Sequence, residues 1–396
     1  MRNSLLSTTF LAITMALTSS LSAQEMTPGE GQLNALFPEG TPYSPYADRN
    51  FPERPLWGDS HLHTALSMDA GGFGNRLGLD EAYRFAKGEE LVGHDGVPVR
   101  ISRPLDFLVV ADHAEYMGVV QGVAAGDSSL KASEAGARWA KMATDGKLLE
   151  VFGEMVADGM ANTPRELDDR FVGSVWNAVI DAAEQYNDPG KFTALIGYEW
   201  SSVPQGDNLH RVVIFRDGPE KAKQVMPFSL FDSEAPEDLW AYMANYEAET
   251  DGRVLAIPHN GNLSAGRMFE LQNFTGAPLT EEYAQMRMRF EPLIETTQIK
   301  GDSETHPLIS PADEFADFER WDLGNLLVTK RTSAAQMQFE YTRAGLKQGL
   351  VQAEILGENP FKYGMIGATD SHTSFASAEE DNYLGKYGVA TPNSER

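Results

Sequence analysis

The feature that most constrains the fold is a set of short apolar runs with the length and composition of buried β-strands. Several are continuous rather than alternating, as expected of strands buried on both faces. Longer stretches with helical periodicity separate them, and this alternation predicts parallel βα units. The clearest strand-like runs lie at 105–113, 192–200, 209–217, 253–260, 292–299 and 363–372, and the clearest helical stretches at 170–187, 233–250 and 333–356.

The chain divides by composition into three parts. Residues 1–23 combine an early Arg2, an interrupted apolar run and the small pair Ser22-Ala23, the layout of a secretory signal peptide; a buried N-terminal helix is the alternative. Residues 24–54 are rich in Pro and Gly and predict an irregular surface segment. We expect 55–396 to form one domain, with a polar helical insertion at about 120–170, in a periplasmic or secreted protein.

Charge and cysteine content narrow the class of protein. The 396 residues carry a formal net charge of −26, which disfavours nucleic acid and anionic membranes as partners and attracts cations. With 42% hydrophobic residues a sizeable core is expected. The absence of cysteine excludes disulfides and zinc–thiolate sites. Any metal ion must therefore be held by His, Asp and Glu.

Side chains that bind metals fall where the strand-like runs end. In a parallel α/β barrel the carboxyl ends of the strands form one mouth, so five separate segments would meet there. His61 and His63 are two residues apart, which on a strand puts both imidazoles on one side and Leu62 on the other. The segments end in His61 and His63, Asp112 and His113, Glu199, His259, and Asp370 and His372.

Each of these residues also has a structural interpretation. A lone His-x-His is weak support for a metal site, and Asp112-His113 fits a helix N-cap followed by a chance histidine. Glu199 can be a buried carboxylate paired with an arginine, and His259 a structural histidine after Pro258. Taken together, the strand ends favour a site for Zn²⁺, Mn²⁺ or Fe²⁺, with Glu199 as a bridge between ions.

The motifs resemble the PHP (polymerase and histidinol phosphatase) superfamily of metal-dependent phosphoesterases, which share this order of ligands. Within this superfamily the chain resembles one branch in particular, the DUF3604 family, and the resemblance covers most of residues 55–386. The phrases that carry it include "GDSHLHTALSMDAGGFGN", "SRPLDFLVVADHAEYMG", "GYEWSSVPQGDNLHRVVIFRD", "IPHNGNLS" and "GATDSHTSFASAEEDNYLGK".

The resemblance implies a distorted seven-stranded (β/α) barrel with helical insertions at its rim and two or three divalent metal ions. It implies catalytic roles for Glu199, Asp370 and His372. The implied ligands are His61, His63, Glu199 and Asp370 for one ion, Glu199, His210 and His259 for a second, and Asp69, His113 and His372 for a third. His210 has an alternative role as a strand residue hydrogen-bonded to a neighbour.

Two departures from the branch stand out. The chain stops twenty-four residues after His372, where members of the branch continue, so we expect a truncated form. The segment 70–103 is long for the superfamily and typical of the branch. His94 within it is expected to be a solvated loop histidine.

These features predict a metal-dependent phosphoesterase, in which a water or hydroxide bridging two ions attacks a phosphate mono- or diester of a small molecule. Arg211, Lys300 and His306 are candidate substrate contacts. A solvated lysine and a loop histidine are equally good interpretations of Lys300 and His306. Hydrolysis of a non-phosphate ester or amide, and secreted metal binding without turnover, remain as alternatives.

Overall fold

The computed structural model describes residues 54–391. The chain divides into two units, Met1–Pro55 and Leu56–Arg396, and the elements below belong to the second. The predicted signal peptide, and the predicted irregular segment as far as residue 53, lie outside the described residues. Within 54–391, none of the helices has both the length and the hydropathy that a membrane span requires.

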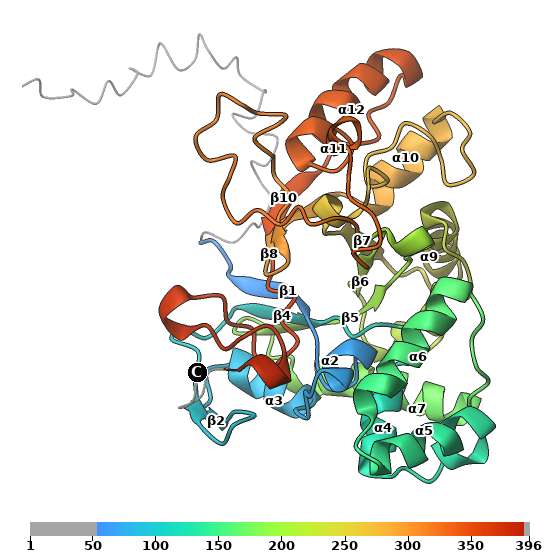
Figure 1. Cartoon of the computed structure of the whole chain (residues 1–396), viewed down its shortest axis with the longest axis vertical. Coiled ribbons are helices and arrows are strands. Elements are labelled where there is room, and N and C mark those ends of the chain that lie inside the picture. The colour runs from blue at the N-terminus through green and yellow to red at the C-terminus, as the bar shows by residue number, and fades with distance from the viewer. Residues whose placement is uncertain (1–53, 392–396) are drawn as a thin grey trace, which may run out of the picture. The chain divides into compact units, whose positions relative to one another are not determined.

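The second unit is a mixed α/β fold around a curled sheet of five strands, in the order β1-β4-β5-β6-β7 (Figure 1). β1, β4 and β5 pair in parallel, whereas β6 is antiparallel to both β5 and β7, and the curled sheet forms a half-barrel. β8 and β10 pair in parallel in a second sheet with β9, and β2 pairs with β3. The strands are β1 (Gly58–Leu62), β2 (Leu91–Val92), β3 (Pro98–Val99), β4 (Phe107–Val110), β5 (Thr193–Trp200), β6 (Arg211–Phe215), β7 (Val254–Pro258), β8 (Leu293–Gln298), β9 (Gly301–Asp302) and β10 (Gly364–Gly367).

The predicted seven-stranded (β/α) barrel is therefore wrong. The six apolar runs do form strands, but only ten residues, 201–210, connect β5 to β6. A parallel pair needs a crossover of a dozen or more residues, so β6 turns back and pairs antiparallel with β5. β8 and β10 hydrogen-bond to each other and not to the five-stranded sheet.

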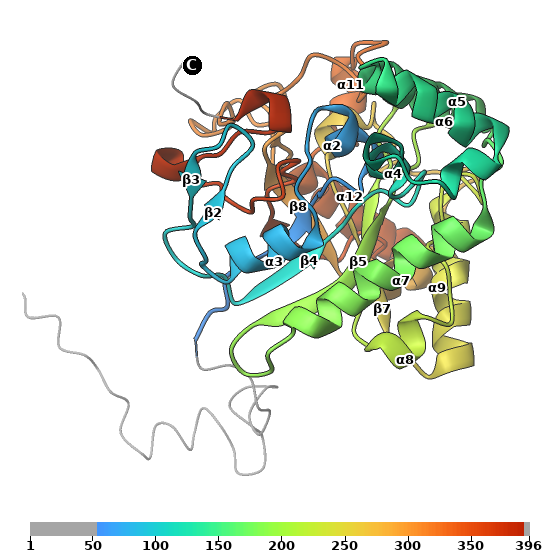
Figure 2. The ribbon, with the colours of Figure 1, turned by 90° about the horizontal axis from the view of Figure 1, so that it is seen from below.

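Two of the three expected helices form where the periodicity predicts them. α7 (Asp169–Tyr186) buries Trp176, Val179 and Ile180 and packs against β5, as Figure 2 shows. α9 (Pro236–Thr250) has proline in its first turn, and Ala235 is its N-cap.

The stretch 333–356 is two helices rather than one, α11 (Ala334–Met337) and α12 (Thr342–Leu356). The N–H groups of Thr342 and Arg343 donate to the carbonyls of Ser303 and Glu304, at 2.8 and 3.0 Å. They are therefore not bonded to the preceding turn, and the helix is interrupted before them.

The segment predicted as a helical insertion contains three helices that share an apolar core of their own, including Val119, Trp139, Val151 and Met155. Figures 1 and 2 both show these helices grouped at one side of the unit. They are α4 (Val119–Ala125), α5 (Glu134–Thr144) and α6 (Leu148–Ala161). The remaining α-helices are α2 (Met68–Gly72), α3 (Leu79–Ala86), α8 (Pro219–Ala222) and α10 (Glu281–Phe290).

Contacts between β1 and the segment after β10 join distant parts of the sequence. The N–H of Asp370 donates to the carbonyl of His61 at 2.8 Å, and the N–H of His63 donates to that of Ser371 at 2.9 Å. The buried Asp59 carboxylate accepts the N–H of Thr369 at 3.1 Å. Asp370 has a φ of 50°, an uncommon backbone conformation for a residue other than glycine, and such conformations concentrate at functional sites.

Candidate metal centre

The structure brings the nine predicted metal ligands into one connected cluster of side chains. Only the Asp69 side chain, with 15% of its area exposed, is more than marginally accessible. The cluster comprises His61, His63, Asp69, His113, Glu199, His210, His259, Asp370 and His372.

Four of these side chains form what we call the central group: His61, His63, Glu199 and Asp370. The two histidine Nε2 atoms lie 3.1 Å apart. Glu199 Oε2 lies 3.5 Å from His61 Nε2 and 3.2 Å from His63 Nε2. Asp370 Oδ1 lies 3.6 and 3.2 Å from the same two atoms. Four ligands about 2.0–2.2 Å from an ion in a tetrahedron are separated by about 3.3–3.6 Å, close to the five distances above. His61, His63 and Glu199 offer atoms that all lie within 4.8 Å of one another.

Unsatisfied buried atoms support the fit to a metal ion. Glu199 Oε2 and Asp370 Oδ1 are both buried and make no hydrogen bond. His259 Nδ1 is in the same state. Buried polar atoms are normally paired, and two carboxylate oxygens aimed at the same pair of imidazoles match the donor set of a divalent cation. These side chains can therefore hold a metal ion.

Glu199 faces a second group through its other oxygen. Its Oε1 lies 2.6 Å from His210 Nδ1 and 2.9 Å from His259 Nε2. Glu199 is the penultimate residue of β5, which lies between the parallel strand β4 and the antiparallel strand β6, and its carboxylate lies between the two groups. One carboxylate with an oxygen in each group has the arrangement needed to bridge two ions.

A third group lies on the other side of His63. Asp69 Oδ2 is 2.6 Å from His372 Nε2 and 3.2 Å from His113 Nε2. Asp69 is in the first turn of α2, and His113 follows β4. His63, Asp69, His113 and His372 all offer atoms within 4.8 Å of one another, so this group also has the composition of a metal site.

The outward-facing nitrogens of the histidines have buried partners that the sequence analysis missed. His61 Nδ1 lies 3.0 Å from Glu295 Oε2, and His63 Nδ1 lies 3.0 Å from Ser67 Oγ. Such contacts fix the orientation of a metal-binding imidazole. His113 differs, because its Nδ1 contacts Ser201 Oγ and also lies 3.2 Å from Glu199 Oε2, so this nitrogen faces the cluster. Glu295 also forms a possible ligand group with His61 and His259.

The electrostatic environment favours the metal-binding form of most of these groups. Burial alone would raise the pKa of Glu199, but the charge of the neighbouring His113, whose own pKa is raised against the effect of burial to about 9 by Glu199 and Asp69, holds the Glu199 pKa well below its usual value. Burial opposes ionisation of Asp370 as well, and adjacent lysine ammonium groups hold its pKa well below normal. Burial lowers the pKa of His210 to about 4 and that of His372 to about 3. Carboxylates that are ionised and imidazoles that are neutral are the forms that bind metals.

His61 behaves differently from these two histidines. Burial would lower its pKa, but the carboxylates of Glu295 and Asp370 outweigh this effect and raise the pKa well above its usual value. A metal ion that binds His61 therefore displaces a proton.

Of the three candidate substrate contacts, the structure places one at the cluster. Lys300 Nζ pairs with Asp370. Arg211 is buried and its Nε donates to Glu291 Oε1 at 3.0 Å, away from the ligand side chains. His306 Nε2 lies 3.2 Å from Asp322 Oδ2 and is not among the cluster's contacts.

Two further differences from the sequence analysis concern Lys386 and His94. Lys386 Nζ lies 3.2 Å from Asp370 Oδ1 and 3.0 Å from His372 Nδ1, although nothing in the sequence marked it beyond its place at the end of "GATDSHTSFASAEEDNYLGK". His94 is half-buried rather than solvated, and its Nε2 lies 3.1 Å from the Thr373 carbonyl.

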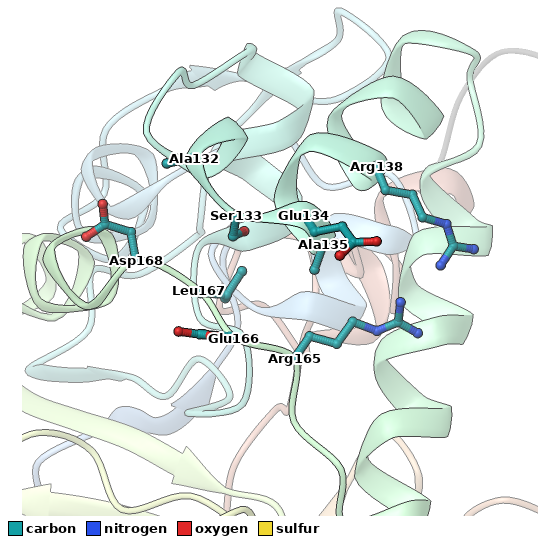
Figure 3. A pocket seen from close by; sticks show the side chains of 9 residues that line it. All are labelled: Ala132, Ser133, Glu134, Ala135, Arg138, Arg165, Glu166, Leu167 and Asp168. Atoms are coloured by element: carbon teal, nitrogen blue, oxygen red, sulfur yellow. The ribbon is translucent and has the colours of Figure 1, made fainter.

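A cavity of about 270 Å³ adjoins the cluster, with Asp69, His113, His210 and Lys300 among its lining residues. A larger cavity of about 640 Å³ lies against α5 and the segment before α7 (Figure 3). The larger one is lined by none of the nine ligands, and its two guanidinium groups, Arg138 and Arg165, are paired with acidic side chains. The smaller cavity is therefore the one that adjoins the candidate metal centre.

Comparison with known proteins identifies a family. No curated protein matches the chain. Residues 50–396 match the family described as "Protein of unknown function (DUF3604)", a span that includes all nine ligand residues. The chain belongs to the DUF3604 family.

Proposed function

We propose that the chain is a metal-dependent phosphoesterase that hydrolyses a phosphate mono- or diester of a small molecule. The observation that carries the proposal is the position of Glu199, whose two oxygens face different groups of histidines. We propose two or three divalent ions, Zn²⁺, Mn²⁺ or Fe²⁺, held by the three groups described above. Bound there, such ions would neutralise charge on phosphoryl oxygens and lower the pKa of water.

The protein's own residues would position the substrate and keep the site in its reactive form. Lys300 lines the cavity and is the cationic side chain that could meet a phosphoryl oxygen, as a point charge. Lys300 and Lys386 together keep Asp370 ionised. We propose Glu199, Asp370 and His372 as the catalytic residues, because Glu199 and Asp370 complete the central group and His372 continues it into the Asp69 group.

We also propose that the DUF3604 family is related to the PHP superfamily. The support is the order of ligand side chains along the chain, from His61 and His63 through Glu199 to Asp370 and His372. The five-stranded mixed sheet does not contribute to this proposal.

One observation favours a second candidate, hydrolysis of a carboxylic ester or amide. Among the described residues that line the cavity, the basic side chains are Lys300 and the histidines His113 and His210. Sites of His and carboxylate ligands also serve ester and amide hydrolysis, so an uncharged substrate is compatible with the same cluster.

A single set of assays separates the candidates. The full chain is purified, its bound metals are counted by mass spectrometry, and phosphomonoesters, phosphodiesters and carboxylic esters are assayed with Mn²⁺ or Zn²⁺. We expect more than one ion per chain and turnover of phosphoesters. Turnover of carboxylic esters alone would favour the second candidate, and turnover that survives complete chelation would refute the metal-dependent mechanism.

A further inference from the structure

The cavity beside the metal-binding side chains has polar groups at one end and apolar walls elsewhere. Asp69, His113, His210 and Lys300 line it where it meets the cluster. The walls are supplied by Phe73, by Phe152, Met155 and Val156 of α6, and by Leu230, Phe231, Leu326 and Leu327. A molecule that reaches the ligand groups through this cavity therefore contacts mainly hydrocarbon.

A row of aromatic rings continues from the metal-binding side chains along one wall. The His372 ring centroid lies 5.2 Å from that of Tyr387. Tyr387 lies 4.6 Å from Phe73, and Phe73 lies 5.3 Å from Phe152, again between ring centroids. The row connects a predicted ligand to the insertion helix α6, so the insertion contributes directly to the space next to the site.

The charged groups of the lining leave no partner for a second anionic group on the substrate. Among the described residues that line the cavity there is one lysine, Lys300, and no arginine. Lys300 is already paired with Asp370. Glu115 is the second acidic residue of the lining; its Oε1 accepts the N–H of Leu230 at 2.7 Å, and its Oε2 is buried without a hydrogen-bond partner, so this carboxyl group offers nothing to an anion. A nucleotide, a sugar bisphosphate or another ligand with several charges would have to give up hydration here without compensation.

The volume suits a compact apolar group. An apolar cavity of about 150 Å³ holds a benzene molecule. The 270 Å³ here is larger, enough for one aromatic ring or a short alkyl chain with room for the reacting head group.

Resting on the proposed phosphoesterase function, we propose that the substrate carries an uncharged aromatic or short aliphatic group, which lies in this cavity against Phe73 and Phe152 of the wall. The insertion helix α6 then selects the substrate, while the strand ends supply the chemistry. The proposal concerns binding, so it can be tested without turnover.

The test measures binding of n-alkylphosphonates, from methyl- to hexylphosphonate, to the metal-loaded full chain by calorimetry. These compounds keep the head group constant and are not hydrolysed. Each methylene transferred from water to an apolar cavity increases affinity about fourfold. We expect an increase of two- to fourfold per methylene over the series, and a smaller dependence on chain length in Phe152→Ala.

Two further variants make the result specific. Phe274→Ala removes a phenylalanine that is 36% exposed and does not line the cavity, and it should keep the wild-type dependence on chain length. Val156→Asn places an amide in the wall and should weaken the binding of hexylphosphonate more than that of methylphosphonate. This variant provides the test if Phe152→Ala does not fold.

Equal affinities along the series, or no binding of any member, would overturn the proposal. Failure to hydrolyse any phosphoester would instead overturn the proposed function, because the calorimetric series does not depend on turnover.

Discussion

Replacement of Glu295 by glutamine tests whether the cluster is a metal site supported by its surroundings. Glu295 Oε2 lies 3.0 Å from His61 Nδ1, and both side chains are fully buried. Glu295→Gln keeps the shape and a hydrogen-bonding group but removes the negative charge behind the imidazole. Loss of such an outer partner typically lowers metal affinity about 10- to 100-fold, or about 1.4–2.8 kcal/mol.

The assay is a competition titration, in which a chelator of known affinity competes with the protein for Zn²⁺ or Mn²⁺ at a fixed pH. Glu340→Gln is the matched control, because Glu340 is also a buried glutamate but belongs to none of the ligand groups. We expect the control to bind metal as the wild type does. If Glu295→Gln binds within twofold of the wild type, or if both variants lose affinity equally, the reasoning about His61 is wrong.

Three further predictions follow from the same contacts. Glu199→Ala should lower the number of ions per chain and abolish phosphoester turnover, whereas an unchanged metal count by mass spectrometry would contradict the bridging role. Complete chelation should lower the free energy of unfolding by about 2.7 kcal/mol for each bound ion, relative to protein held at free metal 100-fold above its Kd, and calorimetry that shows no change would contradict binding to the folded state. Burial raises the pKa of Glu340 from 4.5 to about 8, so the folded protein retains a proton that the unfolded chain loses, and stability should fall as pH rises between these values. Glu340→Gln should therefore be more stable than the wild type above pH 8, by on the order of 5 kcal/mol, with little difference near pH 4 in urea unfolding; a constant difference across pH would refute this assignment.

Seven of the nine candidate ligands could be found from the sequence pattern because each lies where an apolar run ends, whereas Asp69 and His210 came only from the family resemblance. The sheet topology was less accessible. Strand-like runs separated by helical stretches indicate parallel units, but the direction of a strand depends on the connection before it. The ten residues between β5 and β6 are too few for a helical crossover, and this length was available in the sequence.

Glu295 shows what local patterns cannot reveal. It lies within β8, where the sequence Ile294-Glu295-Thr296 marks it only as a polar residue in a strand. Its partner His61 is 234 residues away, so its role depends on how two sheets approach each other. Lys386 is similar, because it meets Asp370 only through the turn of the chain after His372.

Arg211 and His210 show how strand geometry can correct a prediction made from position alone. His210 was expected to be a metal ligand and Arg211 a substrate contact. They are neighbours, His210 directly before β6 and Arg211 its first residue, and successive side chains of an extended chain point to opposite faces. Since His210 faces Glu199, Arg211 must face away, and its guanidinium meets Glu291 in the interior. His61 and His63 are two residues apart and share one face, with Leu62 packed in the apolar core between them. The same period of two that puts the first pair of candidate ligands on one face thus places Arg211 away from the site.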